Sequence, residues 1–225
     1  MAPMNPRLLR PSSGNRDRYF ASVRLLMHMD GTAVDSSRYG VTFGVPPGSF
    51  TTSSKFGTGA YSVDDGQGLA STTRAIPDIS TGSWTVEAWV YRPTADDTYA
   101  NVVCLSASED LESFSGGLNV YIDQDGTVNS NNGLAGALSG GSVPVGQWAH
   151  IAAVMNGSVS TLYVNGVPVA TDSQQVEPGP YYVAVGYVPS AGFASDLVVD
   201  ELRITAGVAR YTAAFTPPAG AFPSR

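Results

Sequence analysis

The sequence predicts an all-β protein, a two-sheet antiparallel sandwich, on the basis of three observations. Apolar and polar residues alternate with period two in several short segments, such as 84–91, as they do in half-buried strands. Turn residues separate these segments, and Asp125-Gly126 and Asn165-Gly166 are dipeptides that favour two-residue hairpins. No amphipathic helix of ordinary length is apparent. Many short strands joined by turns are typical of sandwiches and jelly rolls.

Ten segments are predicted as strands by their alternation and their bounding turns. In 84–91, one face carries Trp84, Val86, Ala88 and Val90, and the other carries Thr85, Glu87, Trp89 and Tyr91. The predicted strands are 23–29, 55–63, 84–91, 101–106, 117–122, 147–155, 160–164, 167–170, 181–187 and 197–204.

The composition agrees with one globular β domain. The chain has 225 residues, enough for one sizeable core, and 43% of them are hydrophobic, which excludes a disordered chain. Only 14% are charged, so Ser, Thr, Asn and Gly must solvate much of the surface. Cys104 is the one cysteine, so no internal disulfide can form, and its apolar neighbours predict a buried thiol.

The chain divides into a basic N-terminal arm, residues 1–22, and a domain, residues 23–225. Residues 1–24 carry a net charge of +4, whereas the remaining 201 residues carry −11. This asymmetry predicts that the arm docks onto an acidic neighbouring subunit. Nucleic acid is not expected as a partner, because the arm has no aromatic ladder and the body repels phosphate. The predicted partner-binding residues are Arg7, Arg10, Arg16 and Arg18.

The first residues contain no apolar stretch typical of a signal peptide, and no segment approaches 18 apolar residues. The sequence therefore predicts a protein that neither spans a membrane nor carries a cleaved secretion signal.

The chemistry of the chain predicts that it is not an enzyme. In segment 197–204, strand parity places Asp200 on one face with Val198, Leu202 and Ile204, and Glu201 on the other. Two carboxylates on opposite faces cannot flank one glycosidic bond. No nucleophile elbow is present, and both histidines lie within strand patterns, where hydrogen-bonded structural histidines are expected.

Sugar binding requires aromatic platforms with polar groups beside them. Trp89, Tyr91 and Tyr99 are the candidate platforms, with Glu87 or Asn119 as the polar neighbour. Trp84 and Trp148 are expected to pack in the core instead.

Several short motifs, taken in order, resemble the laminin-G-like, concanavalin A-like jelly-roll domain over residues 23–222. The end of this region resembles the version found in tailed bacteriophage virion proteins. The motifs are LLMHMDGT at 25–32 with Asp35, KFGTGAY at 55–61, SWTVEAWV at 83–90, GQWAHIA at 146–152, LYVNG at 162–166 and DELRI at 200–204, followed by RITAGVARY at 203–211 and FTPP at 215–218.

The resemblance implies two curved antiparallel sheets, sugar or protein binding, and in many relatives a calcium ion. Asp30 and Asp200 match the positions of the family's opening and closing aspartates, and Asp35 is a third candidate calcium ligand. The alternative is structural, with Asp30 capping the turn at Gly31 and Asp200 accepting backbone N–H bonds.

Two functions follow as expectations. The first is a non-enzymatic virion structural protein, a head decoration or tail component in many copies or as a homo-oligomer, held on capsid or tail subunits by the basic arm. The alternative is a carbohydrate-binding module that recognises host-surface glycans, with or without calcium. The fold suits both functions.

Overall fold

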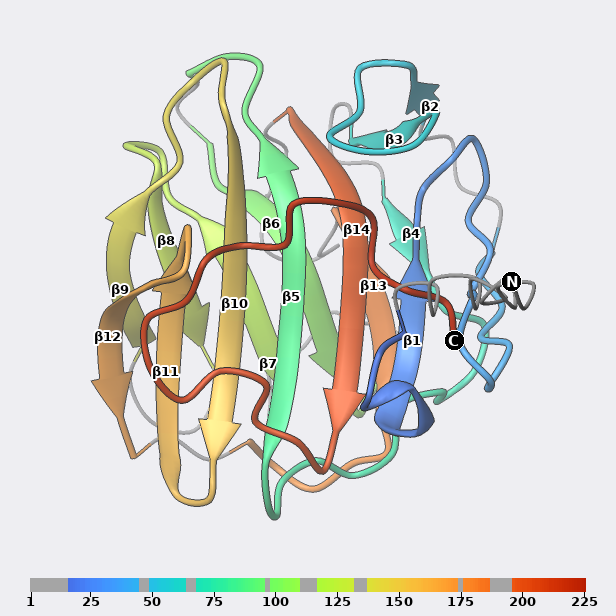
Figure 1. Cartoon of the computed structure of the whole chain (residues 1–225), viewed down its shortest axis with the longest axis vertical. Helices are drawn as coiled ribbons and strands as arrows, with labels where there is room; N and C mark the ends of the chain where they lie inside the picture. The colour runs from blue at the N-terminus through green and yellow to red at the C-terminus, as the bar shows by residue number, and fades with distance from the viewer. Residues whose placement is uncertain are drawn as a thin grey trace, which may run out of the picture.

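A computed structural model describes residues 16–44, 49–63, 68–95, 98–109, 117–131, 137–173, 176–186 and 196–225. These residues form two antiparallel sheets packed face to face (Figure 1). The predicted two-sheet antiparallel sandwich is therefore confirmed. Within the described ranges the only helical element is a 3₁₀ turn at Phe20–Ser22, and no helix is long and apolar enough to cross a membrane.

The larger sheet faces the viewer in Figure 1 and has eight strands in the described part of the chain. Its long strand β14 pairs with β3 through its first residues and with β1 through its last. In spatial order the strands are β12 (Val167–Asp172), β11 (Val159–Val164), β10 (Trp148–Asn156), β5 (Trp84–Tyr91), β14 (Leu197–Ala206), β3 (Ala60–Val63) and β2 (Ser49–Thr51), with β1 (Val23–Met27) beside β14.

The smaller sheet lies behind the larger one and has six strands within the same ranges. They follow the order β4 (Leu69–Ala70), β13 (Tyr182–Val185), β6 (Ala100–Ser106), β7 (Leu118–Ile122), β8 (Thr127–Asn131) and β9 (Ala137–Ser142).

The core lies between the sheets and follows the predicted alternation. Trp84, Val86, Ala88 and Val90 of β5 all belong to the main buried cluster, so their predicted placement on one face is confirmed, and that face is the inner one. Cys104 is also buried, as predicted, but it points to the outer side of the smaller sheet, where it packs with Ala184.

Both predicted hairpin turns are present. Asn165 and Gly166 join β11 to β12 with φ of 50° and 77°, the left-handed pair that a type I′ turn needs. Residues 123–126, which include Asp125-Gly126, join β7 to β8, and the Gly126 N–H donates to the Asp123 carbonyl oxygen at 2.8 Å, so this turn is longer than two residues. The sequence did not predict four of the strands, β2, β4, β8 and β9, because they are short or are rich in Ser, Asn and Gly.

The predicted strand 55–63 is a strand only from Ala60 onward. Ahead of it, the backbone N–H groups of Lys55 and Phe56 donate to Asp200 Oδ2, at 2.8 and 3.0 Å. The N–H groups of Thr58 and Gly59 donate to Asp30 Oδ1. These donors are used by carboxylates instead of a sheet partner, so this segment forms a loop.

A β-bulge overturns the predicted parity of the closing strand. The register of β14 against β5 shifts between Asp200 and Arg203, and Glu201 adopts a φ of 52°. Asp200 stands opposite Trp89, on the outer face, and Glu201 Oε2 accepts the N–H of Phe222, a residue that also packs on that face. Both carboxylates therefore lie on the outer side, because the extra residue cancels the alternation.

The chain after β14, residues 207–225, crosses the outer face of the larger sheet twice and is called the strap below (dark red in Figure 1). Tyr211 and Phe215 stack on each other with ring centroids 3.5 Å apart and pack against Tyr163 of β11. Farther along, Phe222 packs in a second cluster with Trp89. The strap thus buries a sheet face that would otherwise be exposed to water.

The described part of the predicted arm also packs on the domain. The N–H of Asp17 donates to the carbonyl oxygen of Arg225 at 2.9 Å, and Phe20 belongs to the cluster of Trp89 and Phe222. Residues 17–22 therefore belong structurally to the domain. Arg7 and Arg10 lie outside the described residues.

Candidate functional site

A buried charged cluster lies between β5, β10, β14 and the strap, with Glu87 at its centre. Arg203 donates to Glu87 Oε1 through Nε and Nη2, at 2.9 and 2.8 Å. On the other oxygen, the Tyr211 hydroxyl donates to Glu87 Oε2 at 2.7 Å, and His150 Nε2 lies 3.2 Å away. Burial opposes the charged form of Glu87, but these neighbours outweigh it and lower its pKa to about 2.

Asp17 extends this cluster to the surface. Arg210 donates to both Asp17 carboxylate oxygens, at 3.0 and 2.7 Å, and Arg203 Nη1 donates at 3.2 Å. Burial of Asp17 opposes its charge, but hydrogen bonding and the two arginines lower its pKa. Asp17 therefore ties the start of the domain to the closing strand and the strap.

This arrangement removes two of the four predicted sugar-binding residues. Glu87 is 1% exposed and Trp89 is 6% exposed, because the strap and Phe56 cover the face that carries them. Their polar and aromatic surfaces are used inside the protein, so the prediction that they contact a ligand is not supported. Tyr91 remains partly exposed and packs on Trp148 with centroids 5.5 Å apart.

The predicted calcium ligands are engaged in other contacts. Asp35 accepts bonds from the N–H groups of Leu26, Ser37 and Val41 and from the Ser37 hydroxyl. Asp30 holds the loop at Thr58 and Gly59, and although its slight burial opposes charge, these N–H groups lower its pKa.

Asp200 is the least satisfied of the three. Burial raises its pKa to about 6, and its Oδ1 is buried without a partner among the described residues. In those ranges no group of three or more His, Cys, Asp or Glu side chains is placed to hold a metal ion. The carboxylates face N–H donors, so this set does not fit a calcium site. Calcium binding stays a prediction that no comparison tests.

His28 links β1 to the end of the strap. Its Nδ1 lies 2.9 Å from Glu201 Oε1, and its Nε2 lies 2.9 Å from the Ser224 hydroxyl. Bonding to Glu201 raises the pKa of His28 against the opposing effect of burial. His150, hydrogen-bonded inside β10, is the structural histidine that the sequence predicted, whereas His28 follows β1 in a loop.

The outer face of the smaller sheet carries a different chemistry, of amides and tyrosines. Tyr121 of β7 stands directly opposite Asn101 of β6 and Asn129 of β8, and Asn119 shares its face two residues away. Asn101 Nδ2 donates to Asn119 Oδ1, whereas Asn101 Oδ1 and Asn119 Nδ2 are buried without partners in the described part of the chain. Such unpaired amides are costly unless a further partner binds them.

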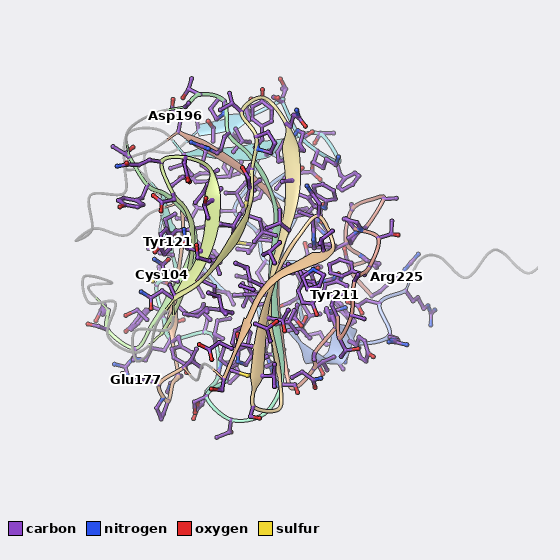
Figure 2. The ribbon with its side chains drawn as sticks, turned by 90° about the vertical axis from the view of Figure 1, so that its left-hand side faces the viewer. Cys104, Tyr121, Glu177, Asp196, Tyr211 and Arg225 are labelled. Atoms are coloured by element: carbon purple, nitrogen blue, oxygen red, sulfur yellow. The ribbon has the colours of Figure 1, made fainter. Side chains whose placement is uncertain are left out.

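Tyr99 extends this face toward solvent. It is 38% exposed, and its ring contacts Tyr121 edge to face at 6.0 Å between centroids. Figure 2 shows Tyr121 and Cys104 on the side of the molecule opposite Tyr211. Tyr99 is thus separated from Trp89 and Tyr91 by the thickness of the sandwich, and the four predicted residues form no single site.

The sequence analysis considered Asn119 as a polar neighbour but missed Asn101 and Asn129. A signal was present for Asn101, which stands between Ala100 and Val102, but Asn129 lies in the Ser- and Asn-rich segment 127–131 and carried none. Which asparagines face the same tyrosine depends on the register between strands. Of the predicted partner-binding arginines, Arg16 and Arg18 are described and both are exposed.

Comparisons with known proteins identify the fold. A family model described as the concanavalin A-like lectin/glucanases superfamily matches residues 64–208. A comparison with curated proteins found no match.

Among solved structures, the binding domain of Paraclostridial Mosquitocidal Protein 1 is similar, with 11% identity, a TM-score of 0.64, and coverage of 84% of this chain and 50% of that one. The receptor binding domain of botulinum neurotoxin D has 13% identity, a TM-score of 0.63, and coverage of 84% and 50%. A third similar structure is that of botulinum neurotoxin type C, a toxin whose cell entry depends on interaction with two ganglioside molecules. It has 13% identity and a TM-score of 0.59, and the match covers 83% of this chain and 48% of that one. The chain spans about half the length of these proteins, and at these identities the likeness shows the fold alone.

Proposed function

Because the chain belongs to the concanavalin A-like lectin/glucanase superfamily, we propose that it is a binding module for carbohydrate and not a catalyst. The observation that carries this proposal is Tyr99, which is 38% exposed on the outer face of the smaller sheet and contacts Tyr121 edge to face. The neighbouring Asn101, Asn119 and Asn129 are 1%, 3% and 5% exposed, so they line this region from below the surface. Tyrosine rings pack on the apolar faces of sugars, so the exposed ring of Tyr99 is the contact surface that we propose. The receptor-binding neighbours support the proposal at the level of fold.

A glycan array, run with and without a chelator, tests the proposal directly. We expect binding by the parent chain and its loss in Tyr99→Ala. The matched control is Tyr39→Ala, because Tyr39 is 47% exposed and lies elsewhere, under the Arg24 guanidinium. Binding that the chelator abolishes would support the calcium prediction as well.

Three outcomes count against the proposal. The parent chain could bind no glycan under either condition, or Tyr39→Ala could lose binding as fully as Tyr99→Ala. Binding that survives Tyr99→Ala but is lost in Tyr91→Ala would move the site to the larger sheet.

A structural role in a virion is the second candidate. Exposed Arg16 and Arg18, which make no ion pair with other described residues, support it as contacts for an acidic neighbour. The test is deletion of residues 1–16 combined with Arg18→Gln, which removes both exposed arginines and spares the structural carboxylate of Asp17. Unchanged occupancy of the shortened protein on particles would contradict a role for the arm.

A further inference from the structure

A basic hollow lies where residues 16–19 meet the strap and the closing strand. Its volume is about 350 Å³, within the range of small-molecule sites. Four guanidinium groups line it, from Arg16, Arg18, Arg203 and Arg210, against a single carboxylate, that of Asp17.

This balance is opposite to that of the whole protein, which has 12 basic and 19 acidic side chains and a net charge of −7. An acidic protein that gathers four arginines in one hollow creates a local positive potential, and such a potential attracts anions. The charge of the hollow is therefore opposite in sign to the net charge of the whole protein.

Two of the four arginines are already neutralised. Arg203 pairs with Glu87 and Asp17, and Arg210 forms a bidentate pair with Asp17. Arg16 and Arg18 make no ion pair within the described ranges, and both are exposed. Two uncompensated guanidinium groups thus remain at the rim, and each can form charge-assisted bonds to an incoming anion.

Aromatic rings complete the lining. Tyr19 lies 4.4 Å beneath the Arg18 guanidinium, and Tyr211 is fixed by its stacking on Phe215 and by its bond to Glu87. At Gly220, which also lines the hollow, a Cβ would meet nothing within 4 Å, so the strap backbone is open to close approach. The Arg18 and Arg210 guanidinium groups both lie over the Tyr19 ring, which holds these charges in place, and the open backbone at Gly220 leaves room beside them for a ligand larger than a simple anion.

We propose that this hollow binds an anionic saccharide, a sugar that carries a carboxylate or a sulfate ester. The proposal rests on the carbohydrate-binding function above and adds a second site, on the other side of the sandwich from Tyr99. Arg16 and Arg18 bind the acidic group, and the sugar ring lies against the open strap backbone at Gly220.

The test is a calorimetric titration of the full chain with glucuronic acid, glucose 6-sulfate and, as the uncharged match, glucose. We expect the hollow to bind the two acidic sugars and not glucose, and higher salt to weaken that binding. Arg16→Gln and Arg18→Gln should each reduce affinity about tenfold, the scale of one charged hydrogen bond.

Arg74→Gln is the matched control, because Arg74 is exposed and lies 5.6 Å over Tyr182 on the smaller sheet. The control should bind acidic sugars like the parent chain. The proposal fails if neither acidic sugar binds, if Arg16→Gln and Arg18→Gln bind like the parent, or if Arg74→Gln alone loses binding. If neither acidic sugar binds, or if the Arg16 and Arg18 variants bind like the parent, neutral glycan binding through Tyr99 should still be observed. Failure of this proposal can therefore be told apart from failure of the proposed function.

Discussion

Removing the charge of Glu87 should destabilise the protein strongly. Glu87→Gln keeps the shape of the side chain but leaves Arg203, which is 4% exposed, with Asp17 as its remaining carboxylate partner at 3.2 Å. Breaking a buried ion pair by neutralising one partner costs about 3–5 kcal/mol, because the other charge stays desolvated. A domain of this size has about 5–15 kcal/mol of total stability, so the loss is a large fraction.

The assay is urea unfolding followed by tryptophan fluorescence, with thermal unfolding as a second measure. At about 2–4 °C per kcal/mol for a domain of this length, the melting temperature should fall by at least about 6 °C. Glu109→Gln is the control, since Glu109 is exposed and the change should stay within about 0.5 kcal/mol.

A double variant separates the lost pair from a general packing defect. Glu87→Leu combined with Arg203→Met removes both charges, so it should be more stable than Glu87→Leu alone. A cost below about 1 kcal/mol for Glu87→Gln, or a double variant with purely additive losses, would refute the reasoning.

Three further predictions follow from the same face. The pKa of Glu87 is about 2 in the folded protein and ordinarily 4.5, so its ionisation stabilises the fold at neutral pH, and this contribution should be lost as the pH falls from about 4.5 toward 2. In urea unfolding at a series of pH values, the free energy of unfolding should therefore change less with pH in this window for Glu87→Gln than for the parent chain. Equal slopes for the two proteins would contradict the assignment. Phe222→Ala, at a side chain 2% exposed, should cost about 3–5 kcal/mol in urea unfolding, against little for Phe50→Ala, which is 37% exposed. Gly166→Ala would place a Cβ 1.9 Å from the Phe215 carbonyl oxygen, whereas at Gly207, where φ is similar, a Cβ would meet nothing within 4 Å. The melting temperature should therefore fall further for Gly166→Ala than for Gly207→Ala. Similar shifts in the two variants would show that the strap does not pack on this turn.

The candidate site shows which features sequence patterns predict and which they do not. Alternation correctly placed Glu87 and Trp89 on the outer side of their strand, because side-chain direction in a regular strand is a local property. The inference that this side was open to a ligand was not supported. The strap that covers it lies more than 100 residues farther along the chain, and nothing in the strand itself encodes that cover.

The same limit applies to the amide face. The asparagines were visible in the sequence, but their gathering around Tyr121 follows from the pairing of three strands. Register is set by contacts across the sheet, which one strand does not specify alone.

Local patterns in the sequence suffice to predict the all-β class, the division of β5 into two faces, the positions of the two hairpin turns, the burial of Cys104 and the resemblance to the lectin-like family. These depend on period-two alternation, turn chemistry and short motifs, which are properties of neighbouring residues. Tertiary structure fixes the directions of Asp200 and Glu201, because the bulge in β14 interrupts the alternation and leaves both carboxylates on the outer face. It also decided which carboxylates are buried and paired, because Asp17, Glu87 and Arg210 meet only when the two ends of the chain close over the sheet.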